Sequence, residues 1–144
     1  MSKKISNPDH LNEILHDQTE RLKELACINR TTAILKESKT IEEALQKTVL
    51  KLPIAWQYPE FTDARIIYDN KAYTSPDFDE SEWVQKQDFT TIENKHGSIE
   101  IFYSKEFETE DEGPFLSEER DLLLNLSSLI TGYINSHLAK DYIK

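Results

Sequence analysis

The hydrophobic period of the chain changes at Pro53, and this change constrains the fold more than any other feature of the sequence. Before Pro53, apolar residues recur every three or four positions, which is the repeat of an amphipathic helix. After it, short segments alternate apolar and polar residues, which is the repeat of a half-buried strand. The turns between these segments are too short for the crossover that a parallel pair needs, so the strands must pair antiparallel. A helical pattern returns near the C-terminus, and the whole order predicts an α+β fold.

Two helices are predicted in the first third of the chain. The first starts at Pro8 or Asp9 and ends near Lys36, where its apolar stripe stops. The second begins after Thr40, which is spaced from Glu43 as in a capping box, where each side chain satisfies a free N–H at the helix start. Both helices are expected to bury an apolar stripe.

Four strands and a long final helix are predicted in the rest of the chain. The strands are expected at residues 61–68, 71–74, 83–92 and 98–103, with turns at 69–70 and 93–97. His96 and Gly97 therefore fall in a turn. Ser117 is the predicted N-cap of the last helix, which reaches Ile143 and spans roughly 40 Å at 1.5 Å per residue. We expect the N- and C-terminal helices to pack on one face of the antiparallel sheet.

The first helix carries a heptad-like row of residues, called here the leucine seam. Its positions alternate steps of four and three, and they are Leu11, Leu15, Gln18, Leu22, Leu25, Asn29 and Thr32. Such a repeat is typical of a coiled coil, and polar residues within it weaken the pairing while they define register and strand number. Two interpretations stand at this point: a helix packed on its own domain, or the seam of a dimer.

The chain carries a formal net charge of −10 over 144 residues. General nucleic-acid binding is excluded, because a phosphate backbone needs a basic surface. The same charge disfavours adsorption to an anionic membrane. The charge is unevenly placed: residues 1–52 carry nine Lys and Arg against eight Asp and Glu, whereas residues 53–144 carry eight against 19. The first two helices are nearly neutral and free to pack together.

The sequence contains no recognisable catalytic or metal-binding group. Cys27, the single cysteine, lies beside the apolar stripe of the first helix, which favours a buried structural thiol over a reactive one. Four histidines are spread over different predicted elements, at His10, His16, His96 and His137. Because metal and acid–base sites need clustered side chains, we expect no enzymatic activity, no metal and no cofactor.

No export signal is visible, because no apolar run follows the charged start. The longest uncharged stretch, residues 122–139, contains too many Asn, Ser and Thr side chains for hydrocarbon. We therefore expect a cytoplasmic protein without membrane insertion. Residues 1–8 are expected to be a disordered start, and residues 9–144 to form one domain with helical extensions.

Three segments resemble those of GAF-type sensory domains. Two are strand-like, residues 56–68 with Trp-Gln-Tyr-Pro ahead of the strand, and residues 97–103. In the third, residues 111–120, the run Phe-Leu-Ser-Glu-Glu is similar to the Phe-x-x-Glu-Glu that opens the last helix of such domains. The variant resembles input modules at the N-termini of bacterial histidine kinases and other multidomain signalling or phosphotransfer proteins. The resemblance covers roughly residues 20–141.

This resemblance implies a GAF/PAS-like sheet with one face on the terminal helices and the other forming a small-molecule pocket. It also implies a homodimer whose terminal helices pass a signal to a covalently linked output domain. Cyclic nucleotides are not implied, because the Asn-Lys and Phe-x-x-x-Asp-Glu signature of the members that bind them is missing. We therefore expect a non-catalytic sensory or regulatory domain, and the alternative is a ligand-free interaction or dimerisation module.

Arg65 is the main candidate for the pocket that the resemblance implies. It lies in the middle of a predicted strand, on the same face as Ile67. Arg65 either pairs with a strand neighbour such as Glu100 or offers two N–H donors to an anionic small molecule. In the second case Trp83 and Phe102 form the apolar walls. The expected ligand-binding residues are therefore Arg65, Ile67, Trp83 and Phe102.

Overall fold

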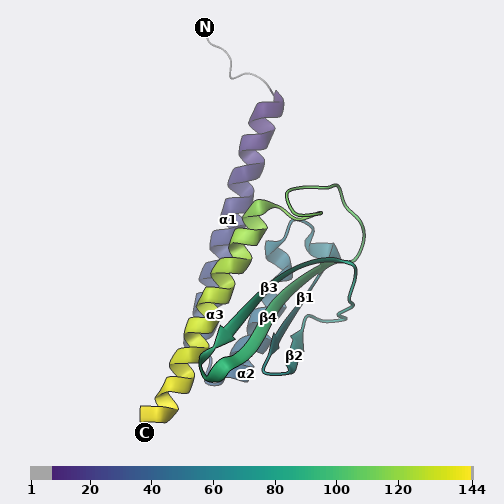
Figure 1. Ribbon diagram of the computed structural model, residues 1–144. Coiled ribbons are helices and arrows are strands. Elements are labelled where there is room, and N and C mark those ends of the chain that lie inside the picture. The colour runs from purple at the N-terminus through teal and green to yellow at the C-terminus, as the bar shows by residue number, and fades with distance from the viewer. Residues whose placement is uncertain (1–7, 144) are drawn as a thin grey trace.

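One antiparallel sheet and three α-helices make up the structure, a computed structural model that describes residues 8–143 (Figure 1). The helices are α1 (Pro8–Glu37), α2 (Ile41–Lys51) and α3 (Ser117–Ile143), and short 3-10 turns cover Pro53–Ala55, Pro59–Phe61 and Ile92–Asn94. The strands are β1 (Thr62–Tyr68), β2 (Lys71–Thr74), β3 (Trp83–Thr91) and β4 (Lys95–Tyr103), in the spatial order β2-β1-β4-β3. Every neighbouring pair is antiparallel, so the predicted α+β fold is confirmed.

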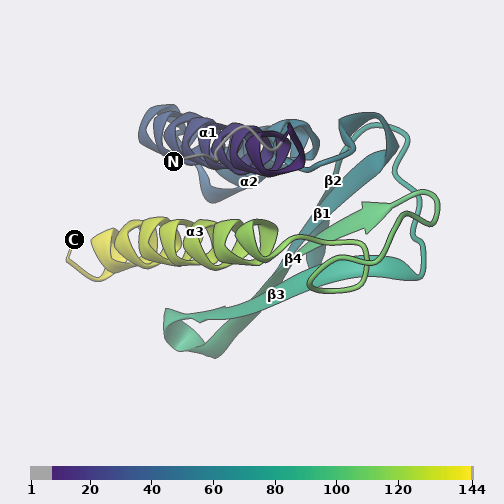
Figure 2. The same ribbon diagram turned by 90° about the horizontal axis from the view of Figure 1, so that it is seen from above.

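The helices all lie on one side of the sheet, as predicted (Figure 2). α2 packs on β1 and β2, α3 packs on β3 and β4, and α1 packs against both of these helices. The alternation of β1 matches this arrangement, because Ala64, Ile66 and Tyr68 are buried while Arg65 and Ile67 are partly exposed on the open face. The expected disordered start, residues 1–8, lies outside the described residues except for Pro8, which begins α1.

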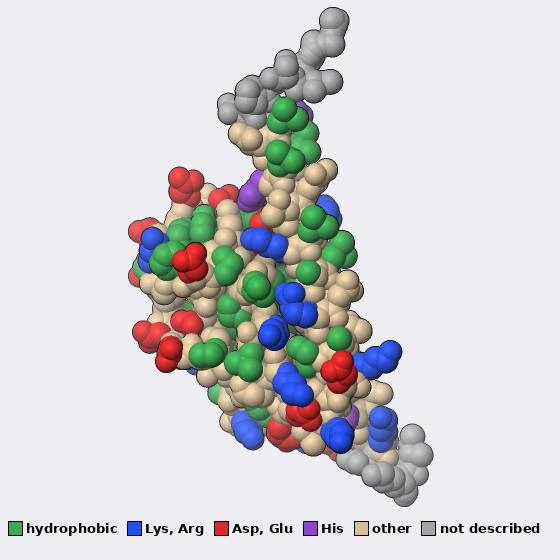
Figure 3. Space-filling model, turned by 180° about the vertical axis from the view of Figure 1, so that it is seen from behind, with side chains coloured by type: hydrophobic (Ala, Val, Ile, Leu, Met, Phe, Trp, Pro, Cys, Tyr) green, Lys and Arg blue, Asp and Glu red, His purple; other side chains and the backbone are tan. Residues whose placement is uncertain are grey.

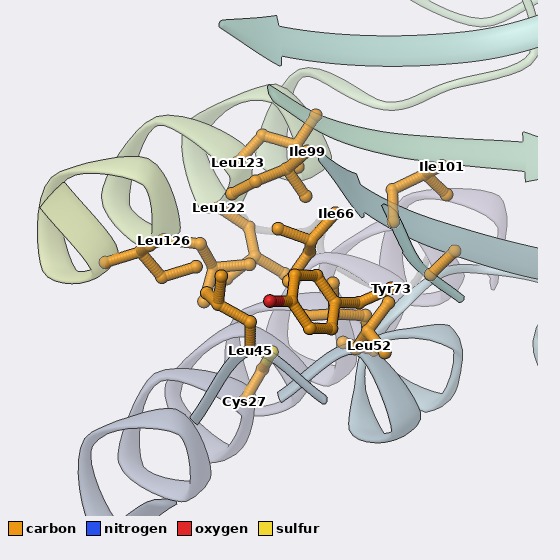
Figure 4. Packing of buried hydrophobic residues seen from close by; sticks show 14 of the residues in the cluster. Cys27, Leu45, Leu52, Ile66, Tyr73, Ile99, Ile101, Leu122, Leu123 and Leu126 are labelled. Atoms are coloured by element: carbon orange, nitrogen blue, oxygen red, sulfur yellow. The ribbon is translucent and has the colours of Figure 1, made fainter. Parts of the chain in front are cut away.

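The buried side chains form one cluster between the sheet and the helices (Figure 4). Its members shown in the close-up come from α1, α2, α3 and the strands: Cys27, Leu45, Leu52, Ile66, Tyr73, Ile99, Ile101, Leu122, Leu123 and Leu126. Burying such side chains contributes roughly 1.5–3 kcal/mol each, and this is the main force that holds the helical layer to the sheet.

The start of α2 has the predicted cap. The Glu43 N–H donates to Thr40 Oγ1 at 3.0 Å, which satisfies one of the free donors at the helix start. The reciprocal bond goes one residue further back than in an ideal capping box, because Glu43 Oε1 accepts the N–H of Lys39 at 3.1 Å. Pro53 follows the helix at the position where its ring prevents continuation.

The start of α3 differs from the prediction. Ser117 is the first helical residue rather than the N-cap, because the carbonyl of Leu116 accepts the N–H groups of Glu119 and Arg120 at 3.0 and 3.2 Å. The Ser117 N–H donates to Asp111 Oδ2 at 3.0 Å. Glu119 supplies the cap in its place, since its Oε1 accepts the N–H of Leu116 at 2.9 Å. A carboxylate three residues into the helix therefore replaces the predicted serine hydroxyl.

The turn between β3 and β4 is shorter than predicted. Glu93 and Asn94 have φ values of 67° and 58°, and Lys95 already pairs with Thr91. His96 therefore belongs to β4, where it is exposed and its Nδ1 lies 3.3 Å from a threonine hydroxyl of β3. Two left-handed residues reverse the chain here.

Gly97 also lies inside β4, at a position where any side chain would clash with its neighbours. A Cβ at this position would lie 2.8 Å from the carbonyl oxygen of Ile67 and closer still to the ring of Phe89, which is directly opposite on β3. The glycine therefore leaves space for a buried aromatic ring in the strand, where the sequence alone suggested a turn.

α1 and α3 lie side by side, run in the same general direction and extend past opposite ends of the sheet (Figure 1). The hydroxyl of Tyr133 on α3 lies 3.3 Å from the carbonyl oxygen of Thr40, which follows α1. Residues 10–19 of α1 are all exposed. Among the described helices, none has the length and apolar character required to cross a bilayer.

Candidate functional site

Arg65 lies on the open face of the sheet and is already paired. Its Nε bonds Oε1 of Glu100, its register partner on β4, and its Nη1 lies 2.7 Å from Oε2 of Glu80. The guanidinium also lies 5.1 Å from the ring centre of Phe78 and 5.4 Å from that of Phe102. Burial alone lowers the pKa of Arg65, but the hydrogen bonds to the two carboxylates outweigh it, and the net shift is upward. The pairing with Glu100 is therefore present, and an anion would have to displace it.

Removal of this arginine has an expected cost in stability. In Arg65→Ala the carboxylate of Glu100, a residue that is only 6% exposed, loses its main partner. We expect the free energy of unfolding to fall by about 2 kcal/mol, because an uncompensated buried charge is unfavourable. The loss is smaller than for a fully buried pair, since the Arg65 side chain is 19% exposed. Urea unfolding measures the loss, and the Arg65→Ala/Glu100→Gln double variant should recover most of it. A matched control is Lys86→Ala, since Lys86 Nζ lies 3.8 Å from Glu100 but its side chain is half exposed.

The other residues expected around Arg65 do not all share its face. Phe102 does: it is 4% exposed and lies edge-on to Phe78 with ring centres 5.4 Å apart. Ile67 also does, two positions along β1 and half-buried. Trp83 does not, because it pairs with Tyr103 and so lies on the face that the helices cover. The expectation that Trp83 and Phe102 form two walls of one pocket is wrong, since a shift of one residue in register moves a side chain to the other face.

A separate cavity lies at the end of the sheet where β1 turns into β2. Its volume is about 230 Å³, and it is lined by residues of α2, β1, β2, β4 and α3 and the turn between the first two strands: Ile41, Glu42, Tyr68, Asp69, Lys71, Tyr73, Lys95 and Leu138. None of these was singled out from the sequence as a binding residue. The signal is weak there because the lining residues are dispersed over nearly 100 positions and carry no local motif.

The charges of this cavity are loosely paired. Lys95 Nζ lies 3.8 Å from Oδ2 of Asp69 and 3.6 Å from Oε1 of Glu93, and both contacts are longer than a hydrogen bond. The ammonium of Lys71 lies 5.5 Å from the ring centre of Tyr73. Tyr73 is only 6% exposed, its hydroxyl has no hydrogen-bond partner among the described residues, and burial, with a contribution from Glu42, raises its pKa. The cavity therefore contains polar groups whose bonding capacity the chain itself leaves unused.

The leucine seam is exposed along α1. Leu11, Leu15, Leu22 and Leu25 are 44%, 58%, 68% and 56% exposed, and hydrophobic side chains gather on this helix where it rises above the sheet (Figure 3). Beside the seam, an open groove of about 400 Å³ separates α1 from α3, lined by Ile28, Asn125, Ser128 and Leu129. Isolated exposed leucines are common, whereas these four lie in one regular row along the helix.

A buried carboxylate connects the start of α3 to the rest of the domain. Glu119 is 2% exposed, and its two oxygens accept the N–H groups of Leu116 and Gln57 at 2.9 and 2.7 Å, with the hydroxyl of Tyr103 at 3.4 Å. Burial, with a smaller contribution from Glu20 of α1, raises the pKa of Glu119 to about 7, although the hydrogen bonds oppose the shift. Glu119 was noticed in the sequence only as part of a helix-opening motif, and it is a proton-binding group near neutral pH.

Cys27 is buried as expected, at 1% exposure, and burial raises the pKa of its thiol. A protonated, covered thiol is unreactive, which is consistent with a structural role. In residues 8–143, no cluster of three or more His, Cys, Asp or Glu side chains is placed to hold a metal ion. The chain matches no known family model, and a search of curated proteins found no relative.

Proposed function

We propose that the chain is a non-catalytic, GAF-like regulatory domain that works as a homodimer, with two copies of α1 paired along the leucine seam. The observation that carries this proposal is the exposure of the seam in the single chain, where its four leucines are 44% to 68% exposed. The remaining seam positions, Gln18, Asn29 and Thr32, are exposed as well. The whole row is therefore free for a partner.

The opposite face of α1 supports the same conclusion. Glu20, Cys27, Thr31 and Leu35 are buried on that face, and α1 packs on α2 and α3. The domain core is thus closed without the seam. A second copy presents an identical row, so the surface is self-complementary, and heptad leucines pack efficiently only against another helix of the same period.

The orientation of the pair follows from the polar residues. Steps of four and three place Leu15, Leu22 and Asn29 at one type of heptad position, a. The other type, d, is occupied by Leu11, Gln18, Leu25 and Thr32. A single asparagine at an a position favours two strands with the asparagines side by side. We therefore expect the two α1 helices to be parallel and in register.

The regulatory part of the proposal rests on how α1 and α3 connect the seam to the sheet. α3 packs on both α1 and the sheet, so a change at the sheet can reach the dimer seam through two packed helices. A covalently linked output domain is the proposed receiver of that signal. A second candidate is a dimerisation module without a ligand, which is favoured by Arg65 having its carboxylate partners and by Phe78 covering Phe102.

Charged substitutions in the seam test the dimer. Leu22→Glu/Leu25→Glu is expected to convert a dimer into a monomer, because four carboxylates would meet in the paired helices. Size-exclusion chromatography with light scattering measures the mass, and circular dichroism checks that the fold is retained. Ile54→Glu is the matched control, since Ile54 is 57% exposed but lies outside the seam. A monomeric parent chain, or equal loss of mass in the control, would contradict the proposal.

Disulfide trapping tests the orientation. Asn29→Cys is expected to form a covalent dimer under mild oxidation, since only a parallel, in-register pair brings the two positions together. Asp17→Cys is the control, because Asp17 is exposed on the same helix but lies off the seam. Cross-linking of both variants at the same rate would contradict the proposed register.

A further inference from the structure

The cavity at the β1–β2 end is distinct from the Arg65 face. It lies on the side of the sheet that the helices cover, between the start of α2, the far part of α3 and the first residues of β4. With a volume of about 230 Å³, it falls below the usual range for drug-sized ligands. It therefore suits a small metabolite.

The charges of the cavity balance. Lys71 and Lys95 contribute two ammonium groups, and Glu42 and Asp69 contribute two carboxylates. No carboxylate among the described residues lies within 4 Å of the Lys71 ammonium. Lys95 Nζ is 3.8 Å from Asp69 and 3.6 Å from Glu93, which lies outside the lining. An anion would be repelled by the acids and a cation by the lysines, so electrostatic complementarity favours a ligand with both charges and no net charge.

The remainder of the lining is apolar or aromatic. The apolar lining consists of Ile41, Leu138 and the rings of Tyr68 and Tyr73. The Tyr68 hydroxyl is already bonded to a threonine hydroxyl of β3 at 2.7 Å, whereas the hydroxyl of Tyr73 has no partner among the described residues. The lining therefore combines an apolar wall, two ammonium groups, two carboxylates and one hydroxyl that has no partner among the described residues.

We propose that this cavity binds a free α-amino acid with an apolar side chain. Its carboxylate would face Lys71 and Lys95, its ammonium would face Glu42 and Asp69, and its side chain would lie on the apolar wall. This inference gives the proposed regulatory domain its ligand, and it rests on that function only for its biological meaning. The binding itself is measured without reference to the dimer.

Three probes separate the parts of the ligand. L-leucine carries both charges, isocaproate lacks the ammonium, and isoamylamine lacks the carboxylate. Isothermal titration calorimetry and thermal unfolding should show binding of leucine, with each truncated probe at least about tenfold weaker, because a charged group then loses its partner. Absence of leucine binding at millimolar concentration, or binding of isocaproate as tight as that of leucine, would overturn the proposal.

Variants of the lining locate the site. Lys71→Met and Glu42→Gln are each expected to weaken leucine binding by about tenfold or more. Lys51→Met is the control, because Lys51 is exposed at the opposite end of α2 and should leave the affinity unchanged. Equal leucine affinity in Lys71→Met and the parent chain would place the ligand elsewhere and contradict the assignment.

The seam variant separates this inference from the proposed function. Leu22→Glu/Leu25→Glu should bind leucine as the parent chain does, since neither residue lines the cavity. If leucine fails to bind while the parent chain is a dimer, the ligand is wrong and the dimer stands. If leucine binds to a parent chain that is monomeric, the cavity assignment stands and the dimer is wrong.

Discussion

Replacing Trp56 by alanine is expected to lower the free energy of unfolding by about 4 kcal/mol. Trp56 is completely buried and belongs to the cluster between the sheet and the helices. Its loss leaves a cavity that rigid strands and helices cannot close. A loss of this size is a large part of the 5–15 kcal/mol that typically stabilises a domain, so we expect Trp56→Ala to be only marginally folded.

Trp56 also takes part in a series of side-chain hydrogen bonds. Its Nε1–H donates to Oε1 of Gln85 at 3.0 Å, and Gln85 is itself fully buried. The Nε2 amide of Gln85 donates to Oε1 of Glu112 at 3.4 Å. Glu112 also accepts two hydrogen bonds from Arg120 of α3, and these bonds hold the pKa of its carboxyl below the usual value. Trp56→Phe keeps most of the volume but leaves the Gln85 oxygen unsatisfied, and we expect it to cost about 2 kcal/mol.

Urea unfolding followed by far-UV circular dichroism measures both losses. Trp83→Ala is the control, because Trp83 is half-buried at the end of β3 and its removal is expected to cost about 1–2 kcal/mol. If the two alanine variants lose equal stability, the special role assigned to Trp56 is wrong. Adding Gln85→Leu to Trp56→Phe should restore part of the loss, because the double variant has neither the indole donor nor the amide oxygen that it leaves unsatisfied.

The elements that sequence reasoning placed correctly are those whose signals are local. The Thr40 cap depends on a side chain and an N–H three residues apart, so four positions suffice to identify it. The β1–β2 turn depends on Asp69 and Asn70, which tolerate the left-handed backbone and have φ values of 51° and 69°. The alternation of β1 likewise states which residues face the core.

The features that were mistaken or missed depend on distant partners. Trp83 was placed beside Phe102 because a pattern of alternating residues does not say how β3 is aligned with β4. Gly97 looked like a turn residue because the need for space arises from Phe89 on the opposite strand. Glu119 was identified only as part of a helix-opening run, because one of its buried hydrogen bonds comes from the N–H of Gln57, which lies 62 positions away in the chain.

The leucine seam is an intermediate case. Its period was visible in the sequence, but a periodic row can face either the domain or a partner. The structure resolves which face is used inside the chain, since Cys27 and Leu35 are buried while Leu22 and Leu25 are exposed. That the exposed row pairs with a second copy stays a prediction.

We expect the stability of the parent chain to depend on pH between about pH 4.5 and pH 7, and Glu119→Gln to remove this dependence. The pKa of Glu119 is about 7 in the folded chain against 4.5 for an exposed glutamate, and burial is the main cause. Between these values the folded chain retains a proton that the unfolded chain has released. The contribution of this group is therefore most favourable below pH 4.5 and declines as the pH rises to 7. The gap between the two pKa values corresponds to about 3 kcal/mol.

The groups around Glu119 explain the sign. Glu20 of α1 faces it and raises its pKa further, whereas the N–H groups of Leu116 and Gln57 and the hydroxyl of Tyr103 favour the ionised form. Their hydrogen bonds do not outweigh the loss of hydration. Deprotonation near neutral pH thus weakens the junction between α1, α3 and the sheet, which is the junction that the proposed signal must cross.

Chemical unfolding at pH 5 and pH 8 measures this effect. A glutamine amide resembles the protonated acid and does not titrate. From pH 5 to pH 8 the free energy of unfolding of the parent chain should therefore fall by about 2–3 kcal/mol more than that of Glu119→Gln. Glu118→Gln is the matched control. It removes a carboxylate from the same turn, and with it the same interaction with the helix dipole, but Glu118 does not make the buried contacts of Glu119. If both variants follow the pH profile of the parent chain, Glu119 is not the titrating group. A downward shift of the Glu119 carboxyl titration to ordinary values in an NMR experiment would contradict the prediction directly.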